Sequence, residues 1–202
     1  MDLSSWLSLV AICCLGAMTP GPSLAVVLRQ TLGNGRLHGI VAGVCHAGGV
    51  ALWAVLSILG LGIMVTKTPA LYMFLTYGGA AYLLWVGVKS LLTKGQSNIN
   101  VEGVRSSLWD AAKDGALISL LNPKLAIFFI ALFSQFVSAE MPGLNQLIIV
   151  STVTIVDGAW YTLVAIALSH SSVLTKLNKK SAMINRVSGI VLIGLAVRVV
   201  TL

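Results

Sequence analysis

Two short breaks of helix-breaking and polar residues interrupt otherwise apolar segments of this sequence. They consist of Pro20, Gly21 and Pro22 in the stretch GAMTPGPSLA, and of Asn122, Pro123 and Lys124 in the stretch SLLNPKLAIFF. Proline lacks an amide N–H and its ring collides with the preceding turn, so each break interrupts a helical hydrogen-bond ladder. Inside a bilayer the freed backbone groups are costly unless they face protein, water or a ligand. The two breaks are therefore candidates for a polar substrate site, whose half-helix N-termini would suit an anion such as a carboxylate.

Each residue of these breaks also has a purely structural interpretation. The prolines can simply kink a helix, Asn122 can cap a helix end, and Lys124 can extend its amine to an interface. In the functional interpretation, Asn122 supplies donors and acceptors to the backbone groups of the break. Lys124 then balances a substrate carboxylate or an acidic side chain.

Asp157, in the stretch TIVDGAWYTLVA, is the only acidic residue well inside an apolar segment. An ionised carboxylate at the centre of a membrane helix costs about 2.5 to 3.5 kcal/mol on insertion scales, which makes it a functional candidate. The alternative is a structural pair with Lys124 or His46. Tyr161 follows one helical turn later on the same face, where it could hydrogen-bond to Asp157, line a cavity or serve as a packing aromatic.

His46, in the stretch GVCHAGGV, is the only histidine far from a predicted membrane interface. A histidine can take up and release a proton near neutral pH, so it could relay protons, and an interhelical hydrogen bond is the alternative. The three cysteines, Cys13, Cys14 and Cys45, lie within apolar segments and are expected to pack as small apolar residues. No second His or Cys stands at metal-ligand spacing, so no metal site is predicted.

The composition predicts an integral membrane protein. Of 202 residues, 57% are hydrophobic and 9% are charged, which leaves too few polar side chains to cover a water-facing surface. The formal net charge of +7 does not indicate a nucleic-acid partner, because the basic residues lie in short loops and not on one soluble face. Only residues 93–108 form a loop of any length, which excludes a substantial soluble catalytic domain. We expect neither an enzyme nor a bound cofactor.

Six apolar runs are long enough for tilted transmembrane helices of about 20 residues each. They cover residues 5–28, 38–65, 70–92, 110–137, 144–169 and 184–201. Basic residues gather in the first, third and fifth loops, whereas the second loop has one and the fourth has none. Because positively charged loops stay in the cytoplasm, we expect both termini on the opposite side of the membrane.

A weak internal repeat relates the two breaks. Trp6 precedes Pro20 by fourteen residues, just as Trp109 precedes Pro123. If the tryptophans lie at opposite interfaces, fourteen residues at 1.5 Å each carry both breaks to a depth of about 21 Å, somewhat past the midplane. The stretches GAAYLLWVGVK and SGIVLIGLAVR align at a similar offset.

The predicted fold is all-α: a single transmembrane domain over residues 1–202, with six helices and with helices 1 and 4 broken at their prolines. Its halves, about 1–98 and 99–202, have three helices each and so enter the membrane with opposite polarity, as in the inverted repeat of many secondary transporters. One face of the second span carries small residues every fourth position, at Gly39, Gly43, Ala47 and Ala51. Such a face suits close helix packing, so the sequence allows a homodimer without requiring one.

Three stretches resemble signatures of the LysE/RhtB family of bacterial amino-acid exporters. They are TPGPSLAVVLRQTLGNGRLHG, GGAAYLLWVGVKSL and SLLNPKLAIFFIALFSQFV, in the family's order and spacing. The paired Pro-Gly-Pro and Asn-Pro-Lys motifs carry most of the specificity. The chain departs from the family at Ser134, where proline is frequent, and at Cys45, where glycine is usual. The second departure, beside His46, could reshape the cavity.

The resemblance implies export of amino acids or close derivatives across the bacterial inner membrane, with protons as the expected driving ion. In that membrane, the distribution of basic residues among the loops predicts that both termini are periplasmic. The hypothesis is that a zwitterion lies near the midplane, with its carboxylate at the two breaks and its ammonium toward Asp157. Proton coupling is then expected at Asp157 and His46. The alternatives are a cation or heavy-metal exporter on the same scaffold, an intramembrane enzyme, and a membrane scaffold protein that transports nothing.

Overall fold

The computed structural model describes most of the first five predicted spans and parts of the sixth. The described residues are 1–19, 21–92, 106–133, 141–167, 183, 186–187, 189–194 and 196–197. In these ranges the secondary structure is helical and no strand occurs. Pro20 and much of the predicted span 184–201 lie outside the described residues.

The first predicted span consists of two helices that meet at an angle. Helix α1 covers Leu3–Met18 and α2 covers Pro22–Asn34, with a bend of 61° between them. Thr19 closes α1, because its hydroxyl and its backbone N–H both donate to the carbonyl of Leu15, at 2.7 and 3.1 Å. Gly21 is extended and precedes α2, whose first residue is a proline, at a position where a missing N–H costs nothing.

The fourth predicted span is divided in the same way. Helix α5 covers Leu108–Leu120 and α6 covers Pro123–Phe133, with a bend of 54°. Ser107 and Asp110 form a capping box at the start of α5, in which the Ser107 hydroxyl accepts from the Asp110 N–H at 3.2 Å. Both divided spans therefore place a helix end and a helix start deep within one apolar segment.

Three further helices are long and continuous. Helix α3 covers Arg36–Lys67, α4 covers Pro69–Leu92 and α7 covers Gly143–Ala167. Gly35 joins α2 to α3 with a φ of 97°, a conformation that favours glycine. These three helices are long and apolar enough to cross a membrane, and each bent pair also qualifies as one span. The described chain is thus an all-α integral membrane protein with three to five candidate spans.

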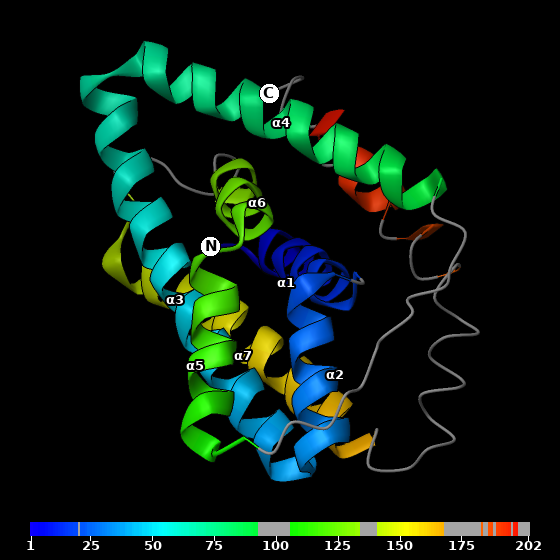
Figure 1. Cartoon of the computed structure of the whole chain (residues 1–202). Coiled ribbons are helices and arrows are strands. Elements are labelled where there is room, and N and C mark those ends of the chain that lie inside the picture. Colours follow the sequence, from blue (N-terminus) through cyan, green and yellow to red (C-terminus); the bar gives the residue numbers. More distant parts are fainter. Residues whose placement is uncertain are drawn as a thin grey trace.

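Helix α3 is the centre of the packing, with α2, α5 and α7 running beside it (Figure 1). Small residues allow the close approach. A Cβ added at Gly43 would lie 2.8 Å from the Cβ of Tyr161, and one added at Gly115 would lie 2.0 Å from the carbonyl oxygen of Ala42. The small-residue face of α3 therefore packs against α7 within the chain, and a second small-residue contact holds α5.

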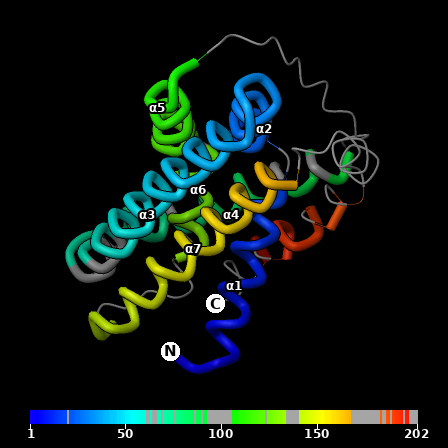
Figure 2. The backbone as a smooth tube through the Cα atoms, turned by 90° about the horizontal axis from the view of Figure 1, so that it is seen from below, coloured from blue at the N-terminus to red at the C-terminus, as the bar shows by residue number. Residues whose placement is uncertain are grey.

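Helix α4 crosses the end of this group at a steep angle, with the described C-terminal residues beside it (Figures 1 and 2). A Cβ added at Gly87 would lie 2.9 Å from the carbonyl oxygen of Gly189. Leu192 and Ala196 are buried in the larger apolar core together with Leu83 of α4. The C-terminal residues thus complete the core over α4 and reach the cavity described below.

A polar cluster joins the C-terminal part of α2 to the start of α5. The carboxylate of Asp114 accepts from Arg29 and, at 2.6 Å, from the side-chain amide of Gln30. Gln30 is buried, and its amide oxygen accepts from the Ser106 hydroxyl at 2.9 Å. The buried Gln30 side chain and the Asp114 carboxylate thus both have hydrogen-bond partners. These interactions fix how α2 and α5 meet beyond the two helix breaks.

Replacement of Gly115 by alanine tests the close contact between α3 and α5. We expect Gly115→Ala to lower the free energy of unfolding by about 1–3 kcal/mol, because the new methyl group would meet the backbone of Ala42. Gly48→Ala is the matched control, since a Cβ there meets nothing within 4 Å. Thermal unfolding in detergent measures both variants. Equal stability of the two would contradict the packing.

Candidate functional site

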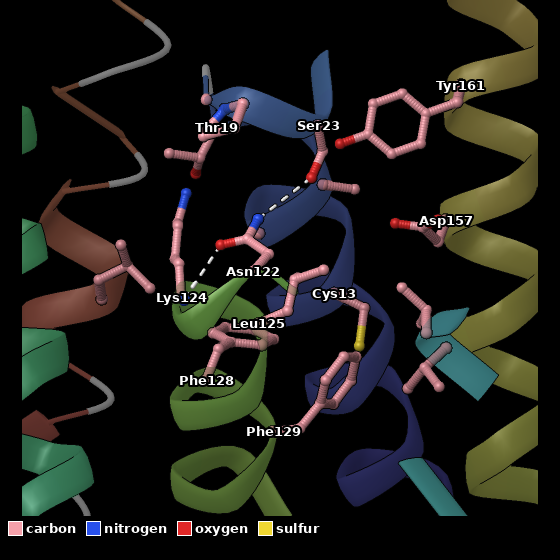
Figure 3. A pocket seen from close by; sticks show the side chains of 17 residues that line it. Cys13, Thr19, Ser23, Asn122, Lys124, Leu125, Phe128, Phe129, Asp157 and Tyr161 are labelled. Carbon is pink, nitrogen blue, oxygen red and sulfur yellow. Dashed lines mark hydrogen bonds between the residues drawn. The ribbon is translucent and has the colours of Figure 1, made fainter. Parts of the chain in front are cut away.

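A cavity of about 50 Å³ lies where the two helix breaks face each other. Its wall is built from α1, α2, α3, α6, α7 and the C-terminal residues (Figure 3). The polar and charged side chains at the wall are those of Thr19, Ser23, Asn122, Lys124, Asp157 and Tyr161. A space of this size holds a few water molecules, so a larger guest requires the surrounding helices to separate.

The two ionisable groups of opposite charge lie on opposite walls. Lys124 projects from α6 toward Thr19 and Asp157 projects from α7 (Figure 3). The Lys124 amine lies 3.8 Å from the position that a Cβ on Gly21 would take, so it reaches the break between α1 and α2. No ion pair between Lys124 and a carboxylate occurs among the described residues. The cavity therefore presents a cation and an anion that do not neutralise each other.

Asn122 connects the two breaks. Its amide oxygen accepts from the backbone N–H of Lys124 at 3.0 Å and thereby caps the start of α6. Its amide N–H group donates to the Ser23 hydroxyl at 3.3 Å, in the first turn of α2. The local cap and the link between breaks are thus made by one side chain, which satisfies donors and acceptors that would otherwise be buried alone.

Asp157 is held by His46 of α3. The His46 Nδ1 and the Asp157 Oδ2 are 2.7 Å apart, the imidazole is fully buried, and the carboxylate residue is 7% exposed. The Tyr161 ring meets the imidazole edge-on, with centroids 4.9 Å apart. The His46 Nε2 is buried with no hydrogen-bond partner in the described part of the chain. Of the two structural partners considered for Asp157, the structure selects His46 and not Lys124.

Six of the residues singled out in the sequence lie at the cavity wall: Gly21, Pro22, Asn122, Lys124, Asp157 and Tyr161. His46 lies behind Asp157, and Pro123 is the first residue of α6. Pro20 lies outside the described residues. The structure thus gathers side chains from three predicted spans around one space.

Sequence reasoning missed two groups of wall residues. Thr19 and Ser23 flank the Pro-Gly-Pro triplet, and their position next to a helix break was a usable signal because hydroxyls satisfy freed backbone groups. The apolar wall, which includes Leu125, Phe128 and Phe129, carried no such signal. These residues are indistinguishable in the sequence from others that face lipid or core.

Comparison with known proteins assigns the family. The sequence matches the LysE type translocator family over residues 14–202. This chain belongs to that family. The match confirms the assignment predicted from the three motifs and supports a membrane transporter, not an enzyme.

Similar proteins of the LysE type translocator family align over nearly their whole length. The chain is 32% identical to a leucine efflux protein of Klebsiella pneumoniae over 197 residues, which are 92% of this chain and 89% of that protein. It is 28% identical to a leucine efflux protein of Salmonella typhimurium, covering 99% and 96%. It is 26% identical to the uncharacterized membrane protein YrhP of Bacillus subtilis, covering 97% and 98%. No solved structure matches the chain.

A double-mutant cycle tests the buried His46 and Asp157 pair. We expect His46→Ala and Asp157→Ala each to lower the free energy of unfolding by about 3–5 kcal/mol, because each leaves one buried partner alone. The double variant should lose clearly less than the sum of the two. Unfolding by denaturing detergent in mixed micelles measures the four proteins. Strict additivity would show that the two side chains are not coupled.

Proposed function

We propose that this protein is a secondary transporter of the bacterial inner membrane that exports amino acids or close derivatives. The observation that carries the proposal is that Lys124 and Asp157 line the same cavity between two helix breaks without forming an ion pair with each other. Two of the relatives are named leucine efflux proteins, which supports an amino acid as the cargo. A zwitterion carries the complementary pair of charges.

The substrate carboxylate is proposed to bind between Lys124 and the start of α2. Gly21 has no side chain there, and the Ser23 hydroxyl and the free N–H groups of the first turn of α2 add donors. The substrate ammonium is proposed to face Asp157, with the Tyr161 ring beside it. In this pose the amino acid replaces the water that solvates both charged groups, and its own charges are balanced.

Coupling is proposed to arise because the protonated imidazole of His46 and the substrate ammonium compete for the Asp157 carboxylate. With His46 protonated, the imidazolium balances Asp157 across their 2.7 Å contact. When the substrate ammonium arrives at Asp157, a second positive charge at that carboxylate is unfavourable, so His46 loses its proton. Release of the substrate then favours uptake of a proton. This exchange yields export driven by proton entry, with His46 and Asp157 as the coupling pair.

The architecture proposed for transport is six spans in two inverted halves, about 1–98 and 99–202, with the first and fourth spans broken at Pro20, Pro22 and Pro123. The halves would rock about the cavity and expose it alternately to the two sides. Because basic loops favour the cytoplasm, both termini are proposed to lie in the periplasm. The unit is proposed to act in the lipid bilayer, as a monomer or a homodimer.

Asn122→Ala tests the site while controlling for helix capping. We expect this variant to lose most efflux, because α6 loses its cap and Ser23 loses its donor at the substrate site. Ser107→Ala is the matched control, since it removes the cap of α5 away from the cavity. Each substitution should lower stability by about 0.5–2 kcal/mol. Radiolabelled amino-acid efflux from proteoliposomes distinguishes them, and equal efflux by both would contradict the site.

A metal-sensitivity assay in a deletion strain separates a cation exporter from this proposal.

Asp157→Asn tests the proton coupling. We expect proteoliposomes with this variant to lose efflux against a gradient, because no carboxylate remains for which the protonated His46 and the substrate ammonium compete. His46→Gln keeps a donor toward Asp157 but cannot be protonated, so it should retain exchange of labelled for unlabelled substrate and lose proton-driven accumulation. Full gradient-driven efflux by Asp157→Asn would refute the coupling role.

The role of the helix breaks is tested separately. Unchanged transport by both Pro20→Ala and Pro123→Ala would remove the support for a site built on broken helices.

A further inference from the structure

The cavity has a polar end and an apolar end. At one end lie Thr19, Ser23, the Lys124 amine and Tyr161. The other end is lined by apolar side chains of α1 and α6 (Figure 3). Cys13, Leu125, Phe128 and Phe129 form the apolar end (Figure 3), and the lining residues Val50 and Val153 belong to the same buried apolar cluster. Four helices contribute lining residues to it, so it is not the face of a single helix.

The charges at the wall are also limited in number. Among the described residues that line the cavity, Lys124 supplies the positive charge and Asp157 the negative charge, and no further Asp, Glu, Lys, Arg or His lines the wall. The α-carboxylate and the α-ammonium of an amino acid use both. A third charge, on a lysine, arginine or glutamate side chain, would be desolvated against the apolar end without a partner, which is costly.

From these two observations we infer that the apolar end is the seat of the substrate side chain and that the cargo is a neutral amino acid with an apolar side chain. The inference rests on the proposed export function and deepens it. The α-carbon would lie between Lys124 and Asp157, and the side chain would extend along α6 toward Phe128. The cavity must widen to admit such a guest, and the proposed rocking of the halves provides that movement.

Phe128 is the side chain that sets the size of this seat. Its ring is nearly buried, and a Cβ added at Gly16 of α1 would lie 3.1 Å from its Cζ. Gly16 and Phe128 both line the cavity, so a methyl group at position 16 crowds the ring and narrows the space, whereas a shorter side chain at position 128 enlarges it. The two changes should shift the preferred side-chain size in opposite directions.

Competition in proteoliposomes tests the inferred substrate class. Exchange of labelled leucine is measured against unlabelled leucine, methionine, alanine, serine, lysine and glutamate. We expect leucine and methionine to compete at least about tenfold better than serine, lysine and glutamate. Equal competition by lysine or glutamate would overturn the inference while leaving amino-acid export in place. If no amino acid exchanges or competes, the proposed function itself fails.

Two variants locate the seat. Phe128→Leu should improve competition by the larger phenylalanine relative to leucine, and Gly16→Ala should improve competition by alanine relative to leucine, each by about tenfold. Phe133→Leu is the matched control on α6, because Phe133 is fully buried but does not line the cavity. The order in which amino acids compete with leucine should be the same for this variant as for the unchanged protein. Gly16→Ala adds only one methyl group within a helix, so it still tests the inference if Phe128→Leu fails to fold. Unaltered rankings in both variants would place the side chain elsewhere.

Discussion

The structure depends on one constraint: a backbone polar group within hydrocarbon must have a partner. The chain ends α1 at Met18 and starts α6 after Asn122, deep within segments otherwise suited to cross a bilayer. Thr19 satisfies the end of one helix and Asn122 the start of the other. Because such satisfaction requires hydroxyls and amides facing inward, the breaks and the cavity arise together.

The second constraint is close helix packing, which makes the buried acid tolerable. Gly43 and Tyr161, and likewise Ala47 and Gly158, bring α3 and α7 into direct contact. At that separation the imidazole of His46 reaches the Asp157 carboxylate. A buried carboxylate without this partner would be strongly unfavourable, so the small residues of α3 have an electrostatic consequence as well as a steric one.

The cavity combines these features in an order that suits an amphipathic guest. Charge and hydrogen-bond donors lie at the helix breaks, and aromatic and aliphatic side chains lie along α1 and α6 beyond them. The polar cluster around Asp114 holds α2 against α5 on the other side of the breaks. The bent pairs α1–α2 and α5–α6 therefore both contribute to the cavity wall and form the packed contact beside it.

The sequence by itself determined the membrane class, five of the segments that the described helices occupy, and the residues at the breaks, because apolar length and proline chemistry are local properties. It also indicated the family, since the Pro-Gly-Pro and Asn-Pro-Lys motifs are contiguous. Tertiary structure alone decided that Asp157 pairs with His46 and not Lys124, that Asp114 joins Gln30, and which apolar residues line the cavity. These facts depend on which faces of distant helices meet. In a chain that is apolar nearly everywhere, hydrophobicity does not distinguish a face toward lipid from one toward a substrate.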